Sequence, residues 1–179
     1  KITSVDSIKY WNTSKLEDMT FAFANTFIED VDGLSEWDTS MVNDMAGSFT
    51  GCFKLKDISG LKKWNTAKVK RFDYILKDTR IIDLDALTGF DTSSLESISE
   101  AFANIRTLKN INGIRNWNVS KVKSLKELFR DTGFSDLSPL EKWDVSNVVD
   151  MESTFAYTKI KNVDALKSWD VSKVKTFEA

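Results

Sequence analysis

The chain has 179 residues, of which 41% are hydrophobic and 12% aromatic, so it can bury a sizeable core and is not a disordered segment. Its 25 basic and 27 acidic residues give a net charge of -2, which excludes a strong positive field that would attract nucleic acid or an anionic membrane. One cysteine and no histidine exclude an internal disulfide framework and remove the commonest metal ligand and general base.

The sequence repeats itself along its whole length. Each repeat carries an aromatic anchor at the start of a short polar motif, and successive anchors are 26 or 27 residues apart. The anchors are Trp11, Trp37, Trp64, Phe90, Trp117, Trp143 and Trp169. A fixed period of this size predicts a solenoid. We therefore expect residues 1–179 to form a single solenoid domain, and we expect the chain to be a fragment of a larger protein.

Apolar residues recur at fixed distances from each anchor. In the second repeat they are Ile28, Val31, Leu34, Val42, Met45 and Phe49. Burying about seven large side chains per repeat contributes on the order of 10 to 20 kcal/mol, whereas ordering one repeat costs roughly 40 kcal/mol. A repeat cannot fold alone, so neighbouring coils must stack. No apolar run approaches the roughly 20 residues of a transmembrane helix, and we expect no direct membrane insertion of this segment.

Within a repeat, the spacing of the apolar residues fits short extended pieces joined by tight turns. We expect one strand over residues 28–34 and a second around residues 42–45. The stretch from Met45 to Phe49 pairs apolar residues at positions i and i+4, which predicts a single helical turn there. The repeat is therefore expected to combine short parallel strands with single helical turns.

Two polar columns accompany the anchors. Asx residues directly after the anchor, such as Asp38, and serines two residues later, such as Ser40, are typical of side chains that cap turns. A second acidic column precedes the anchor by seven residues, as at Asp57 and Asp136, and stacked carboxylates of this kind can bind calcium. Because Asn110 interrupts that column and no glycine-rich calcium repeat is present, we favour backbone capping.

Carboxylates are spread along these columns from repeat to repeat instead of converging once, and neither a phosphate-binding glycine loop nor a nucleophile elbow is present. We therefore predict no catalytic, cofactor-binding or metal-binding residues, no cofactor, and no enzymatic activity. Function is expected where repeats differ. Met41 and Lys70 lie in variable columns, Arg71 extends a row of lysines, Tyr74 belongs to the irregular third repeat, and Tyr157 lies outside the apolar columns. These five residues are the candidate ligand-binding positions.

The motif over residues 37–45, followed by Phe49, Gly51, Cys52 and Leu55, closely resembles the repeat of the BspA-like leucine-rich repeat family of bacterial surface proteins. Residues 143–151 match it equally well, and residues 134–140 are more distantly similar to internalin-type leucine-rich repeats. Phe90, Ala67 and Leu76 depart from the common pattern. The resemblance implies an α/β repeat: a right-handed, leucine-rich-repeat-like solenoid of about seven stacked coils.

The resemblance also implies a non-catalytic, extracellular protein-interaction or adhesion module at the bacterial cell surface, wall- or lipid-anchored through parts outside this chain. Its expected partner is a surface protein or glycan of a host or neighbouring cell, and no nucleic acid. One alternative is a structural stalk or spacer that displays another domain. A weaker alternative is a calcium-stabilised or glycan-binding solenoid.

Overall fold

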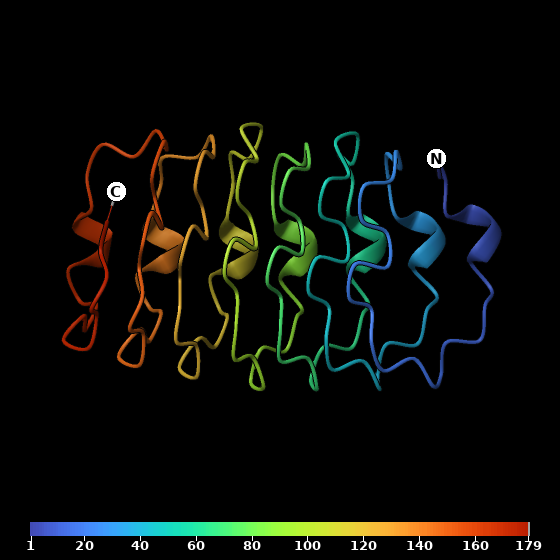
Figure 1. Cartoon of the computed structure of the whole chain (residues 1–179), viewed down its shortest axis with the longest axis horizontal. Helices are drawn as coiled ribbons and strands as arrows, with labels where there is room; N and C mark the ends of the chain where they lie inside the picture. Colours follow the sequence, from blue (N-terminus) through green and yellow to red (C-terminus); the bar gives the residue numbers. More distant parts are fainter. Residues whose placement is uncertain (179) are drawn as a thin grey trace.

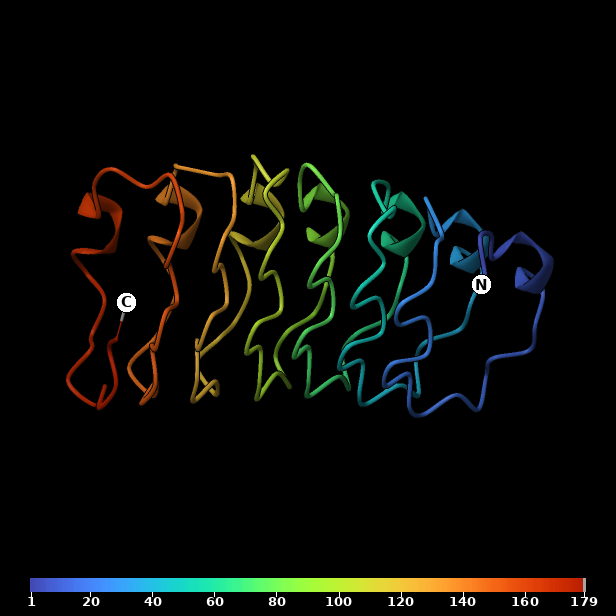
Figure 2. The same ribbon diagram turned by 45° about the horizontal axis from the view of Figure 1, so that its top comes forward.

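The computed structural model describes residues 1–178, and its coils stack side by side from the N-terminus to the C-terminus (Figure 1). We number the coils by their anchors, from Trp11 in the first to Trp169 in the seventh. Within residues 1–178 the helical elements are seven short 3-10 turns, which line one edge of the solenoid (Figure 2). They are η1 (Asp6–Ile8), η2 (Asp32–Leu34), η3 (Ser59–Leu61), η4 (Asp85–Leu87), η5 (Asn112–Ile114), η6 (Ser138–Leu140) and η7 (Asp164–Leu166).

The acidic column before the anchor starts these 3-10 turns. Asp57 Oδ1 accepts the amide N–H of Ser59 at 2.8 Å, and Asp136 Oδ1 accepts that of Ser138 at the same distance. Asn110 makes the equivalent bond to the amide of Asn112, also at 2.8 Å. An Asx side chain that accepts the amide two residues ahead fixes the chain in a turn. The capping role predicted for this column is therefore confirmed by its contacts.

Neighbouring turns pack closely where the middle residue of the second turn is glycine. A Cβ on Gly113, in η5, would lie 1.7 Å from the carbonyl oxygen of Leu84 in the preceding coil. The pairs η1 with η2, η2 with η3, and η4 with η5 are the most tightly packed, and the second turn of each pair has glycine in the middle. Pairs whose second turn carries Ala86, Pro139 or Ala165 pack less closely. One residue per coil thus sets the local spacing.

Two secondary-structure predictions are wrong. The strand expected over residues 28–34 is absent, because its second half forms η2. The helical turn expected over Met45 to Phe49 is also absent, because Gly47 has a φ of 63° and Gly51 one of 69°, which interrupt a right-handed helix. The second expected strand is reduced to isolated parallel bridges, such as Asp44 to Arg71. Within residues 1–178 the structure contains only such isolated bridges and no strand of two or more residues.

The segment after each bridge is a ribbon of overlapping turns. In the first coil the amides of Met19, Phe21, Phe23 and Asn25 donate to carbonyl oxygens of the second coil at 2.8 to 2.9 Å. The intervening amides bond locally, as Ala22 does to the Met19 carbonyl. Phe21 and Asn25 have positive φ, which prevents the extended conformation of a strand. In the following coils the ribbon amides also donate to the next coil, so its inter-coil bonds all run in one direction.

The aromatic anchors of the central coils are part of the hydrophobic core. Trp64, Trp117 and Trp143 are buried, and each indole Nε1–H donates to a backbone carbonyl of the preceding coil, at 3.0 Å from Trp143 to Ile114. Phe90 is equally buried but has no indole donor. Phe72 contacts both Phe90 and Trp117, with ring centroids 5.8 and 5.6 Å away. The core therefore continues through the irregular third and fourth coils.

Candidate interaction surface

The third and fourth coils interrupt a polar column that caps turns elsewhere. Seven residues after the anchor, Asp44 Oδ1 accepts the amide of Ala46 at 2.9 Å and Asp150 Oδ1 accepts that of Glu152 at 3.0 Å. In the first coil the hydrogen bonds from Thr20 hold the pKa of Asp18 below its ordinary value. The third and fourth coils place Arg71 and Ser97 in this column instead.

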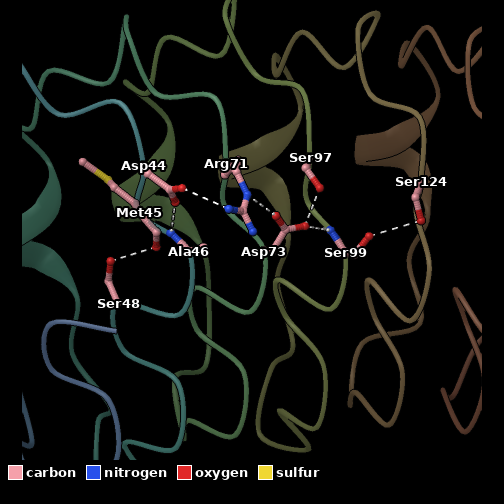
Figure 3. Close-up of polar contacts among 9 residues, drawn as sticks. All are labelled: Asp44, Met45, Ala46, Ser48, Arg71, Asp73, Ser97, Ser99 and Ser124. Carbon is pink, nitrogen blue, oxygen red and sulfur yellow. Dashed lines mark hydrogen bonds and ion pairs between the residues drawn. The ribbon is translucent and has the colours of Figure 1, made fainter. Parts of the chain in front are cut away.

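Asp73, in the third coil, supplies the cap that Ser97 does not provide in the fourth coil. Its Oδ1 accepts the amide N–H of Ser99 at 2.9 Å and the hydroxyl of Ser97 at 2.5 Å. Its Oδ2 accepts Arg71 Nε at 3.1 Å, and the Asp73 side chain is only 7% exposed. Figure 3 shows these side chains in one row across adjacent coils. A buried carboxylate is stable here because its oxygens are paired.

Arg71 joins this network to the second coil. Its Nη1 also donates to Asp44 Oδ2 at 3.1 Å, so its guanidinium lies between two carboxylates (Figure 3). The hydrogen bond to Asp73 and the negative charge of Asp44 raise the pKa of Arg71. Half of the Arg71 side chain remains exposed, at 51%. The result is a guanidinium of fixed orientation that still faces solvent.

The exposed residues around this guanidinium form what we call the Arg71 surface: Met41, Lys68, Lys70, Arg71 and Glu96. Lys68 Nζ lies 3.1 Å from Met41 Sδ, and Lys70 Nζ lies 3.3 Å from Glu96 Oε1. A shallow pocket of about 570 Å³ adjoins it, lined by Arg71, Glu96, Ser97, Ser120, Lys121, Lys123 and Asn147. This surface combines a guanidinium of fixed orientation with an exposed apolar side chain.

The five candidate binding residues do not form one site. Met41, Lys70 and Arg71 lie on the Arg71 surface. Tyr74 is half-buried with a φ of 58°, and Lys77 Nζ lies 5.6 Å from its ring centroid. Tyr157 is 75% exposed, has a φ of 60°, and packs against Arg130 near another edge of the coils. Both tyrosines occupy backbone positions that disfavour bulky side chains.

Sequence reasoning missed Asp73, Ser97 and Ser99. Asp73 lies two residues beyond the capping column, and its main partners are in the next coil. One signal was available, because Arg71 cannot accept an amide hydrogen bond where the other coils have an acceptor.

The acidic columns use their oxygens on backbone amides. Hydrogen bonds from Ser40 lower the pKa of Asp38, and the amide of Ser59 does the same for the pKa of Asp57. In the part of the chain that the structure describes, no group of three or more carboxylate or thiol side chains lies close enough to hold a metal ion. Nor does any described helix have the length and apolar character needed to cross a membrane.

Comparison with known proteins identifies a family and a fold. The model of a family described as "Mycoplasma protein of unknown function, DUF285" matches residues 1–111 and 81–179, which together span the chain. No curated protein matches. Among solved structures, an internalin (inlF) from Listeria monocytogenes is 16% identical, with a TM-score of 0.53 over 99% of this chain and 51% of the internalin. An internalin C2 (inlC2) from the same organism is 18% identical, also with a TM-score of 0.53, over 99% of this chain and 76% of that one.

This chain therefore spans about half the length of the first internalin. At these identities the likeness is one of fold. It confirms the predicted resemblance to internalin-type repeats and the leucine-rich-repeat-like solenoid.

Proposed function

This chain belongs to the DUF285 family, and we propose that it is a non-catalytic protein-interaction and adhesion module at the outer surface of a bacterial cell. The observation that carries the proposal is the Arg71–Asp73 network, where two coils abandon the local capping pattern. A capping aspartate at position 71 would suffice for folding alone, as it does at Asp44 and Asp150. The third coil instead supports an exposed guanidinium on a buried carboxylate.

A fixed guanidinium is a favourable contact for a protein partner. Free arginine side chains lose rotamer freedom on binding, about 0.5 to 1.5 kcal/mol for each immobilised side chain. Two carboxylates already orient Arg71, so less of that entropy remains to be lost. Met41 adds apolar area on the same surface, where it is 39% exposed. Arginine and methionine are both enriched at protein interfaces.

The proposed partner is a surface protein or glycan of a host or neighbouring cell. The resemblance to bacterial surface proteins and the internalin-like fold support this setting, together with attachment through parts outside this chain. The close Lys70–Glu96 pair and Met41 favour a protein over a glycan as the partner of the Arg71 surface. A protein surface can match both signs of charge as well as the apolar side chain.

Adhesion of coated beads to cultured cells tests this function. Beads carrying residues 1–179 are expected to bind saturably, and protease treatment of the cells should abolish binding. The variant Met41→Asp/Lys68→Glu/Lys70→Glu should lose most binding, because it inverts two charges and removes the apolar side chain of the Arg71 surface. It should stay folded, because these exposed side chains lie outside the core. The matched control Lys142→Glu/Lys167→Glu changes two exposed lysines away from the Arg71 surface and should bind normally. Absence of saturable binding by the unaltered chain would overturn the proposal.

A structural spacer is the second candidate. It is favoured by the hydrogen bonds and buried apolar residues that link successive coils along the described chain. A spacer has no ligand of its own, so absence of saturable adhesion by the unaltered chain would support it. Normal adhesion by the Met41, Lys68 and Lys70 variant would instead place the binding on another surface. If instead glycosidase treatment of the cells, and not protease treatment, abolished adhesion, the glycan-binding alternative would be favoured.

A further inference from the structure

Arginines gather in a groove across the third, fourth and fifth coils. The groove has a volume of about 560 Å³, and Arg80, Arg106 and Arg130 line it. These are three of the five arginines in the chain. Phe53, Asp78, Thr79, Asn104, Thr107 and Asp131 complete its lining. We call this feature the arginine groove.

Three polar residues with left-handed backbone conformation form the floor of the groove. Asp78, Asn104 and Asp131 occupy equivalent positions in successive coils, and their φ angles are 62°, 62° and 52°. Asx residues tolerate this left-handed conformation better than most side chains. Asn104 Nδ2 donates to Asp78 Oδ1 at 3.0 Å, which fixes two of these side chains relative to each other. The polar floor is therefore an outcome of the repeat architecture.

A buried glycine follows Arg106 in the same column of the next coil. Gly133 occupies in the fifth coil the position that Arg106 has in the fourth. A Cβ there would lie 2.3 Å from the carbonyl oxygen of Arg106, so a side chain does not fit without moving the backbone. The Arg106 side chain itself is 82% exposed.

The guanidinium groups of Arg80 and Arg106 retain binding capacity, whereas Arg130 Nη1 lies 3.6 Å from Glu127 Oε2. Arg106 uses Nε on Asp131 Oδ2 at 2.8 Å, and no bond from its terminal nitrogens occurs within residues 1–178. Arg80 is exposed and forms no salt bridge with any described residue. The guanidinium carbon of Arg130 lies 5.3 Å from the ring centroid of Tyr157. A planar guanidinium with free terminal nitrogens matches a carboxylate through two parallel hydrogen bonds.

We propose that the arginine groove binds an acidic peptide segment of a partner protein, with its carboxylates on Arg80 and Arg106. Phe53, 53% exposed, and Tyr157, 75% exposed, supply apolar contacts at the rim. The carboxylates of Asp78 and Asp131 can accept peptide N–H groups, which the backbone of a peptide ligand supplies. The proposal extends the protein-binding function above to a separate surface.

Fluorescence polarisation with labelled peptides of about twelve residues tests the groove. One peptide contains aspartate, glutamate and leucine, and its control replaces each carboxylate by the matching amide. The acidic peptide should bind saturably, and at least about tenfold more tightly than the amide peptide. Arg80→Gln/Arg106→Gln should weaken binding of the acidic peptide at least about tenfold. Arg115→Gln, which removes an exposed arginine that bonds to Asn112 and Ser138, should leave binding unchanged.

Three outcomes would overturn the proposal. One is equal binding of both peptides, and another is an equal loss in the Arg115→Gln variant. The third is saturable binding of heparin with none of the acidic peptide, which would assign the groove to a glycan. Circular dichroism checks that each variant keeps its fold. The Met41, Lys68 and Lys70 variant should retain peptide binding, so failure of the groove proposal and failure of the Arg71 surface are distinguishable.

Discussion

The carboxylate of Asp73 caps the backbone amide of Ser99 in the next coil, at 2.9 Å. This bond crosses between repeats, whereas the equivalent caps at Asp44 and Asp150 lie within one repeat. The same carboxylate holds the Arg71 guanidinium, so folding and the proposed binding surface depend on one buried side chain.

Replacing Asp73 by alanine should destabilise the fold strongly. The change leaves the Ser99 amide and the Ser97 hydroxyl without their acceptor and removes one carboxylate partner from Arg71. Loss of a buried, charged hydrogen-bond partner costs about 3 kcal/mol. Urea unfolding measures this loss, with Asp91→Ala as control because Asp91 caps Ser93 from an exposed position. Equal losses in the two variants would contradict a special role for Asp73.

Replacing Trp143 by phenylalanine should cost less. The substitution removes the hydrogen bond from the indole to the Ile114 carbonyl, at 3.0 Å, and a few buried ring atoms. The expected decrease in unfolding free energy is about 1 to 2 kcal/mol. Phe90 shows that the solenoid accepts phenylalanine at an anchor. Trp11→Phe is the control, because Trp11 is 62% exposed, and thermal unfolding should find it nearly neutral.

Adding a methyl group between two coils should be strongly destabilising at Gly113 and harmless at Gly89. A Cβ on Gly113 would meet the Leu84 carbonyl oxygen at 1.7 Å, whereas a Cβ on Gly89 has its nearest neighbour at 3.7 Å. We expect Gly113→Ala to cost about 2 to 3 kcal/mol or more, because backbone must move. Gly89→Ala should change the unfolding free energy by less than about 1 kcal/mol. Chemical denaturation of both variants would refute the packing argument if the losses matched.

Stability should fall in acid through the capping aspartates. Hydrogen bonds from serines hold the pKa values of Asp38, Asp91 and Asp144 below the ordinary 3.8. A carboxyl whose folded pKa is depressed contributes stability above its unfolded pKa and loses it as pH falls through the folded value. The urea midpoint should therefore drop as pH falls from about 5 toward 2.

A triple substitution of these aspartates by asparagine isolates their contribution. Asparagine still caps the turn, as Asn65 does for the Ala67 amide at 3.1 Å, but it does not titrate. The triple variant should remain folded at neutral pH, and its midpoint should depend less on pH between about 5 and 2. An unchanged slope would mean that other carboxylates govern acid unfolding.

The sequence predicts most of the packing because the repeat samples each structural position several times. Leu34, Leu61 and Leu140 occupy one column and are all buried, so periodicity alone located core positions. The aspartate columns were equally readable, because an Asx cap acts within two residues. Local conformation was harder to predict. The apolar pair Met45 and Phe49 indicated a helical turn, whereas the positive φ at Gly47 produces a different ribbon.

Most of the candidate site was beyond such reasoning. Asp73 acts on Ser99, 26 residues away, and only the stacking of coils brings them together. Tyr74 is half-buried, has a positive φ and places its ring beside Lys77, and its irregular position in the repeat indicated none of this. A property that depends on two neighbouring coils cannot be read from the pattern of one.

The ribbon of turns also orients the peptide dipoles of its backbone. Its inter-coil amides donate toward the C-terminal end, as from Met19 to Asp44 and onward from Met45 to Arg71. Peptide dipoles alternate in an ordinary sheet and largely cancel, but here they add along the stacking axis. Each of these ribbon dipoles has its negative end toward the N-terminal end of the solenoid. The amides just before the bridges, as from Asn43 to Glu17, donate the other way, so the two neighbouring rows of each coil carry opposed dipoles.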